Sequence, residues 1–119
     1  MHKVNIAEKF GLFRDQWSPK LVGTLDDYEI KLVRIEGDFL WHSHEREDEL
    51  FLVVEGAFRM DFRDRSVTVN AGEFLVVPHG VEHKPFAERE CKIILFERKG
   101  VPNTGQHVNE RTVAAPEPI

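Results

Sequence analysis

Several features are scarce or missing in this 119-residue chain. It has a single cysteine, Cys91, so an internal disulfide is impossible. One unpaired thiol is typical of a protein from a reducing compartment. The first residues, Met1-His2-Lys3-Val4-Asn5, lack the apolar stretch of a signal peptide. We therefore expect the protein to be cytoplasmic.

The sequence also lacks the marks of a nucleic-acid or membrane protein. Its net charge is -5, and its 16 lysines and arginines do not gather into one cluster. Binding to a phosphate backbone requires a basic face. No apolar run approaches the length of about 20 residues that crosses a bilayer. We therefore expect no nucleic-acid partner and no membrane partner.

What the sequence does contain, from Lys20 onward, is strand patterning. Phe58, Met60 and Phe62 occupy alternate positions, which is typical of a half-buried strand. Turn signals recur about every ten residues, a spacing that favours a sandwich or barrel. Sustained alternation of strands and helices is missing, which disfavours a doubly wound parallel sheet. We expect strands at 21–25, 28–36, 39–44, 49–54, 58–63, 67–69, 74–77, 83–86 and 91–97.

The two ends of the chain depart from this pattern. Ile6 and Phe10 have helical spacing, which predicts a short N-terminal helix or turn packed on the barrel. Residues 114–119 are expected to be extended or disordered, or to form an arm around a second subunit. The expected organisation is a single domain over 1–119, with an N-terminal helix or turn at 1–19, a barrel at 20–100 and an extended C-terminal tail at 101–119.

The most informative motif is His42-Ser43-His44, followed by Glu49 and later by His83. On a strand, residues i and i+2 point to the same face, whereas on a helix they point to nearly opposite sides. Both histidines can therefore bind one metal ion if this segment is a strand. Three imidazole nitrogens and one carboxylate oxygen suit a divalent transition metal: Fe, Mn, Ni, Zn, Co or Cu. The ligand set alone does not choose among these metals.

These spacings resemble the two motifs of the cupin superfamily. The run from His42-Ser43-His44 through Glu49 to Gly56 is similar to the first motif. The run from Gly72 through Pro78-His79-Gly80 to His83 is similar to the second, and about fifteen residues separate the two, as in the smallest single-domain cupins. The resemblance implies an all-β fold, an antiparallel jelly-roll barrel. It also implies that the metal ligands are His42, His44, Glu49 and His83.

Two positions depart from the family pattern. Gly37 is one residue closer to the first histidine than usual, which is a minor change in a loop. Ala87 stands where the second motif usually ends in Asn, so a structural hydrogen bond is lost. Three further segments resemble a subgroup of small cupins that is loosely labelled mannose-6-phosphate isomerase-like and has no settled activity: Trp17-Ser18-Pro19-Lys20, Glu49-Leu50-Phe51 and Asn103-Thr104-Gly105.

Several other side chains are expected to lie outside the metal site. We expect His79 and the charged pair Lys31 and Arg34 to be exposed, although an inward orientation would let the pair reach an anionic substrate. We expect Ser43 to face away from the metal. Cys91 is interpreted as a small buried hydrophobe. The large apolar side chains are expected in the core: Phe51, Phe58, Met60, Phe62, Phe74, Phe86 and Phe96.

Two classes of function fit this interpretation. The first is a metalloenzyme of isomerase, lyase or dioxygenase type that acts on a small polar organic molecule. The second is a non-catalytic binding module for a sugar or carboxylate ligand. The sequence identifies no general base, and Glu82 is a candidate because it adjoins His83. We also expect a homodimer, because small jelly rolls have sheet edges to cover.

Overall fold

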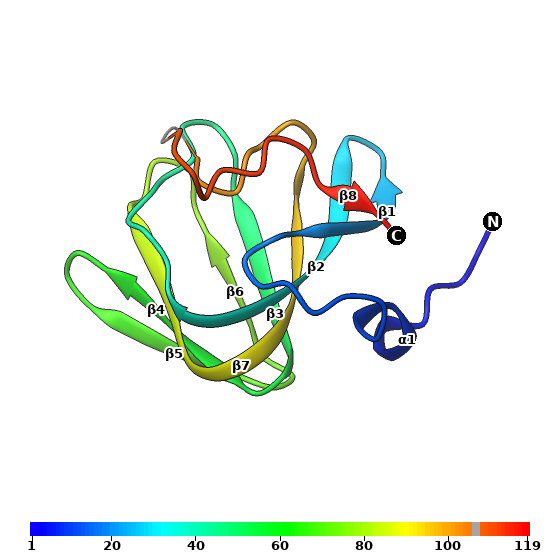
Figure 1. Cartoon of the computed structure of the whole chain (residues 1–119). Helices are drawn as coiled ribbons and strands as arrows, with labels where there is room; N and C mark the ends of the chain where they lie inside the picture. Colours follow the sequence, from blue (N-terminus) through cyan, green and yellow to red (C-terminus); the bar gives the residue numbers. More distant parts are fainter. Residues whose placement is uncertain (106–107) are drawn as a thin grey trace.

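The computed structural model of the chain describes residues 1–105 and 108–119 (Figure 1). Strands make up most of the regular structure, with one short helix near the N-terminus. Within the described residues, no helix combines the length and the apolar character needed to cross a bilayer. The elements are α1 (Ile6–Phe10), β1 (Lys20–Leu25), β2 (Tyr28–Asp38), β3 (Glu49–Glu55), β4 (Ala57–Phe62), β5 (Ser66–Asn70), β6 (Phe74–Val77), β7 (His83–Arg98) and β8 (Glu117–Pro118).

Strand β7 organises the barrel. Along its 16 residues it pairs antiparallel with β4, β2 and β3. Strand β1 extends the sheet beyond β2, β5 extends it beyond β4, and β6 pairs with β3. The result is the expected all-β, largely antiparallel barrel. The prediction of two strands at 83–86 and 91–97 was wrong, because the exposed charged residues 88–90 between them form an irregularity opposite Glu36 of β2 and do not interrupt the strand.

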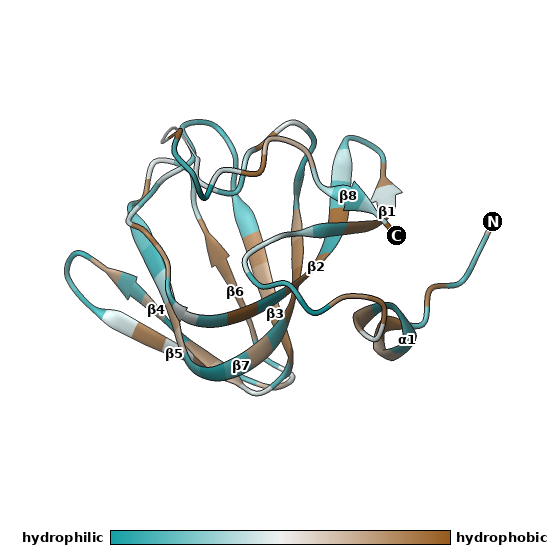
Figure 2. Ribbon diagram, viewed as in Figure 1, coloured by the Kyte–Doolittle hydropathy of each residue, from teal (hydrophilic) through white to brown (hydrophobic). Residues whose placement is uncertain are grey.

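Alternating side chains fill the inside of the barrel. In β4, for example, Phe58 and Met60 are buried while Arg59 between them is exposed. Cys91 is also fully buried, as expected. Phe74 corrects the predicted core, because it lies on the outer side of the edge strand β6 and is 64% exposed. Figure 2 shows the apolar residues along β3 and β6. The buried core consists of Val33, Ile35, Phe51, Val53, Phe58, Met60, Val69, Val77, Ala87, Cys91, Ile93 and Leu95.

A second, smaller cluster lies outside the barrel, beneath α1. The side chain of Asn5 accepts a hydrogen bond of 2.9 Å from the backbone N of Glu8 and so caps the helix. Phe10 and Phe13 pack against Leu32 on the outer face of β2. The predicted N-terminal helix is confirmed. Because α1 covers β2 from outside while the barrel covers it from inside, β2 is buried on both faces.

The end of the tail also packs on the barrel. Strand β8 pairs in parallel with β1, and the backbone N of Ile119 donates to the carbonyl of Leu21 at 3.0 Å. The described end of the tail is therefore extended and pairs with its own chain, and an arm around a second subunit stays a prediction. Residues 106 and 107 of the predicted tail lie outside the described residues.

Candidate metal centre

The two-histidine segment, His42-Ser43-His44, forms one wall of the site. The prediction of a regular strand over 39–44 was wrong. Within the described residues, the segment forms backbone hydrogen bonds to neighbouring chain along one of its edges, as an isolated bridge. His42 and His83 exchange backbone hydrogen bonds of 3.0 and 2.9 Å, and Gly80 N donates to His44 O at 2.7 Å. The segment is nevertheless extended, so the two imidazoles lie on the same side and both are buried.

Glu49 and His83 reach the site from two different strands. Glu49 begins β3, where it pairs with Val77 of β6 on one side and with Glu97 of β7 on the other. His83 begins β7 and pairs with Phe62 of β4. Backbone pairing therefore fixes both side chains at the same end of the barrel as the two-histidine segment.

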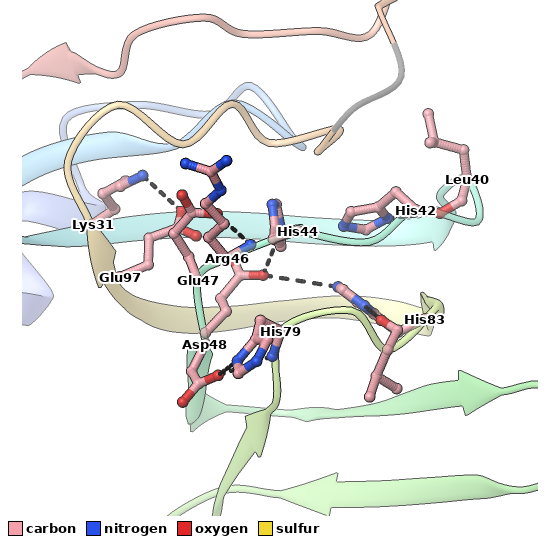
Figure 3. Close-up of polar contacts among 12 residues, drawn as sticks. Lys31, Leu40, His42, His44, Arg46, Glu47, Asp48, His79, His83 and Glu97 are labelled. Atoms are coloured by element: carbon pink, nitrogen blue, oxygen red, sulfur yellow. Dashed lines mark hydrogen bonds and ion pairs between the residues drawn. The ribbon is translucent and has the colours of Figure 1, made fainter.

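The structure brings the four sequence-predicted residues together. Their potential ligand atoms all lie within 4.8 Å of one another. Nε2 of His44 lies 3.1 Å from Oε1 of Glu49, and Nε2 of His83 lies 3.8 Å from the same oxygen (Figure 3). Two ligand atoms on opposite sides of one metal ion would be about 4 Å apart. We call this group the four-residue cluster: His42, His44, Glu49 and His83.

Backbone carbonyls orient two of the imidazoles. Nδ1 of His42 lies 3.0 Å from the carbonyl oxygen of Leu40, and Nδ1 of His83 lies 2.9 Å from that of Val81. A carbonyl can only accept, so each Nδ1 carries the proton and each Nε2 keeps its lone pair. Metal-binding histidines commonly make this outer hydrogen bond.

One nitrogen in the cluster has no hydrogen-bond partner. Nε2 of His83 is buried and unpaired, although an unpaired buried polar atom costs free energy. A metal ion would give this lone pair a partner. Together with the oriented rings and the carboxylate, the unpaired nitrogen shows that the donor set fits a divalent transition metal.

Burial also sets the charge state of the cluster. Desolvation, followed by the charge of His83, lowers the pKa of His42 to about 4. Burial by itself would raise the pKa of Glu49, but the hydrogen bond from His44 and the charges of His44 and His83 outweigh it, and the pKa is lowered. Near neutral pH the cluster therefore offers a neutral His42 imidazole and an ionised carboxylate, the forms that bind metals.

Behind the cluster lies a layer of three carboxylates that the sequence did not reveal. Glu29, Glu97 and Glu49 stand side by side across β2, β7 and β3, in that order. We call them the carboxylate layer. Desolvation and the negative charge of Glu49 raise the pKa of Glu97 well above its ordinary value, and Oε2 of Glu97 is buried without a hydrogen-bond partner.

Lys31 supplies a positive charge to this layer. Its Nζ lies 2.7 Å from Oε1 of Glu97 (Figure 3). It also lies 3.7 Å from Oε1 of Glu29. The prediction that Lys31 is exposed was wrong, because it shares the inward orientation of Val33 and is 2% exposed. Lys31 pairs with Glu97 and lies near Glu29, and a divalent cation beside Glu49 would bring a second positive centre to the layer.

The cluster opens into a narrow pocket in the barrel. His42 and Glu49 lie in its wall, and Asn103 adds one more polar side chain. The rest of the lining is apolar, and the cavity has a volume of about 40 Å³. The apolar lining residues are Trp17, Pro19, Val33, Ile35, Phe39, Phe51, Pro85, Ile93 and Leu95.

Other residues considered from the sequence lie elsewhere. His79 is exposed, as expected, and its ring Nδ1 lies 2.9 Å from Asp48. Glu82 is exposed and pairs with Arg63 at 3.2 Å, so the position beside His83 in the sequence does not bring its carboxylate to the cluster. The prediction that Arg34 is exposed was wrong, because α1 covers it and its Nη2 donates to the carbonyl of Phe10 at 2.8 Å.

The barrel and its cluster agree with a known family. The Cupin_2 family, described as a cupin domain, matches residues 31–96, a stretch that includes the whole four-residue cluster. This chain belongs to the cupin family. The resemblance in the sequence and the expectation of an all-β cupin barrel are thereby confirmed.

Solved structures agree with this assignment. The cupin has a TM-score of 0.80 and 48% identity to a cupin-2 domain containing protein from Shewanella frigidimarina NCIMB 400, over 81% of this chain and 94% of that one. Against NMB1881 from Neisseria meningitidis the TM-score is 0.76 and the identity 31%, over 82% and 100% of the two chains.

A relative from Bacillus subtilis (strain 168) is matched over a shorter stretch. The uncharacterized protein YdbB is 34% identical over 64 residues, which cover 53% of this chain and 57% of YdbB. The cupin therefore spans little more than half the length of this relative.

Proposed function

We propose that this cupin is a metalloenzyme of isomerase, lyase or dioxygenase type. One divalent transition metal would be held by the four-residue cluster: His42, His44, Glu49 and His83. The unpaired Nε2 of His83 is the observation that carries the proposal, because a buried lone pair aimed at a carboxylate and two more imidazoles lacks any other partner. The metal would be iron, manganese, nickel, zinc, cobalt or copper.

The chain's own residues would prepare this site for chemistry. The carbonyls of Leu40 and Val81 accept hydrogen bonds from Nδ1 of His42 and His83, so that the Nε2 atom of each ring would face the metal. The apolar walls exclude water. A bound metal supplies Lewis-acid polarisation of a substrate oxygen, or redox chemistry if it is iron. Four protein ligands would leave two positions open in an octahedral site.

The pocket indicates the shape of the substrate. Two of its polar side chains, His42 and Glu49, belong to the cluster, while Val33, Phe51 and Leu95 form part of an apolar wall. The substrate would therefore place one or two oxygen atoms at the metal and an apolar body against this wall. The small pocket volume favours a molecule of few atoms. The expected substrate is therefore polar at one end and apolar over the rest, a smaller class than the small polar molecule expected from the sequence.

The alternative, a binding module for a sugar or carboxylate ligand, has less support. The described lining includes neither lysine nor arginine, and Glu49 contributes negative charge. A carboxylate or phosphate would thus have the metal as its single positive partner. Binding without turnover in the metal-loaded protein would favour this alternative.

Elemental analysis of protein purified without an affinity tag tests the metal site. We expect about one equivalent of a transition metal in the wild type and its loss in His83→Ala, because that variant lacks the unpaired nitrogen. Exposed His79→Ala is the matched control and should keep the metal. Equal metal contents in His83→Ala and wild type would contradict the site.

A pair of ligands tests the expected substrate shape. Acetylacetone has two oxygen donors and apolar ends, whereas mannose 6-phosphate is polar throughout and charged. Calorimetry on the metal-loaded cupin should detect acetylacetone and not the sugar phosphate. Tighter binding of the sugar phosphate would contradict the proposed substrate class and leave the metal site standing.

A further inference from the structure

The two-histidine segment has strand pairing on one edge and a loop on the other. In an extended chain, successive peptide groups point to opposite edges. His42 and His44 direct their carbonyl oxygens to the backbone of His83 and Gly80. The carbonyl of Ser43 therefore points the other way, where a sheet would supply another strand.

A turn of the C-terminal region occupies that other edge. The backbone of Gly105 lies so close to Ser43 that a Cβ atom at Gly105 would overlap the Ser43 carbonyl oxygen and lie 3.0 Å from its carbonyl carbon. Gly105 also has a positive φ of 62°, which favours glycine. Only glycine fits this approach without displacing the two-histidine segment.

Side chains of the turn itself bond to residues 111–113. Asn103 donates through Nδ2 to the carbonyl of Arg111 at 2.9 Å and accepts through Oδ1 from the backbone N of Val113 at 2.6 Å. Buried Thr104 lies with its Oγ1 2.7 Å from Oγ1 of Thr112. Arg111 in turn donates through Nη2 to the carbonyl of Asp38 in β2 at 3.0 Å, which ties the turn to the barrel.

Asn103 and Gly105 also link the turn to the pocket. Asn103 lines the apolar pocket beside His42 and Glu49, and Gly105 lines a second hollow beside His44. The turn thus borders two hollows that the cluster also borders. Its residues neither carry a metal-binding atom at the cluster nor belong to the barrel strands.

We propose that Asn103-Thr104-Gly105 is a positioning element of the metal centre, which we call the C-terminal strap. Gly105 packs against the backbone of Ser43, and this contact fixes the directions of the His42 and His44 imidazoles. This inference rests on the proposed metal site and concerns residues that the metal would not touch. Loosening the strap should weaken metal binding while the barrel stays folded.

Cobalt binding in two glycine variants tests the strap. Gly105→Ala adds a Cβ that must displace Ser43, whereas Gly100→Ala adds one at φ 84° with no atom within 4 Å. Both variants carry backbone strain, but only the first disturbs the contact. Gly105→Ala should lose about tenfold or more in Co(II) affinity and change the visible absorption of bound Co(II), whereas Gly100→Ala should match the wild type in both.

Asn103→Ala serves as the second variant if Gly105→Ala does not fold. It removes the hydrogen bonds that hold the strap and adds no clash, so Co(II) affinity should fall while circular dichroism keeps the strand signal. Wild-type affinity and spectrum in either folded variant would overturn the inference, as would equal losses in Gly105→Ala and Gly100→Ala. Failure of the wild type to bind any Co(II), Fe(II), Mn(II), Ni(II), Cu(II) or Zn(II) would overturn the proposed function, and the strap inference with it.

Discussion

The inside of the barrel has two halves that are built from the same strands. In β3, Glu49 is followed on the same face by Phe51 and Val53, and in β7, Ile93 and Leu95 are followed by Glu97. One half is closely packed and apolar. The other contains the carboxylate layer, Lys31 and the four-residue cluster. Strands β3 and β7 thus each contribute to the apolar half and to the polar half.

Burial has opposite effects on the stability of the fold in the two halves. In the apolar half, removal of side chains from water stabilises the fold. In the polar half, the same removal keeps Nε2 of His83 unpaired and gathers like charges, which costs stability. We expect substitutions in the two halves of the metal-free protein to differ accordingly.

The largest loss should come from the apolar half. Phe58→Ala removes a ring that is 2% exposed and should lower the free energy of unfolding by about 3–5 kcal/mol, because the packed barrel cannot close the cavity. Phe74→Ala, at a position 64% exposed, is the control and should cost less than about 1 kcal/mol. Urea unfolding measures both, and equal losses would erase the distinction between core and surface.

The buried ion pair should come next. Lys31→Met leaves Glu97 without its cation and should cost about 3 kcal/mol in the free energy of unfolding. The double variant Lys31→Met/Glu97→Leu should recover most of this loss, because it removes both buried charges. A double variant that is less stable than Lys31→Met would contradict this account.

Acidification should produce a smaller loss that belongs to the polar half. Since the pKa of His42 is about 4 in the folded protein and 6.5 as its ordinary value, the unfolded chain takes up the proton first as pH falls. Stability of the metal-free protein should therefore decrease by about 1.5 kcal/mol between pH 6.5 and pH 5. Comparison with His42→Gln isolates the effect, and parallel pH profiles would argue against a depressed pKa.

The smallest effect on stability should accompany a complete loss of metal binding. Glu49→Gln keeps the shape of the side chain and removes one charge from the carboxylate layer. The free energy of unfolding should change by less than about 1 kcal/mol. Metal titration should show no binding in this variant. A large destabilisation without metal would mean that Glu49 serves the fold as well as the site.

The sequence was sufficient to predict the barrel and the residues that meet in the cluster. His42 and His44 can be paired without coordinates, because i and i+2 share a face in any extended segment. Glu49 and His83 joined them through the resemblance to the two cupin motifs. Whether these residues bind metal stays a prediction. The cytoplasmic location, the homodimer and the lack of a nucleic-acid partner also stay predictions.

The inward orientation of Lys31 and of Glu29 in the carboxylate layer could not be predicted from strand patterning. In β2, apolar Ile30 alternates with charged Glu29 and Lys31, which indicates that the charged residues face outward. The structure has the opposite orientation, because α1 covers the outer face of β2. One signal was present, since Lys31 has the parity of the buried Val33 and Ile35. The strap gave no such signal, because its contact with Ser43 joins two irregular segments.

The length of β7 limits how this cupin can change through insertions and deletions. His83 and Glu97 lie an even number of positions apart, so both face the interior of the barrel. Gain or loss of one residue between them would turn one of the two outward, unless a compensating bulge absorbed it. Point substitutions can change the walls of the pocket one side chain at a time. A change of one residue in the length of β7 would separate the metal centre from the carboxylate layer in a single step.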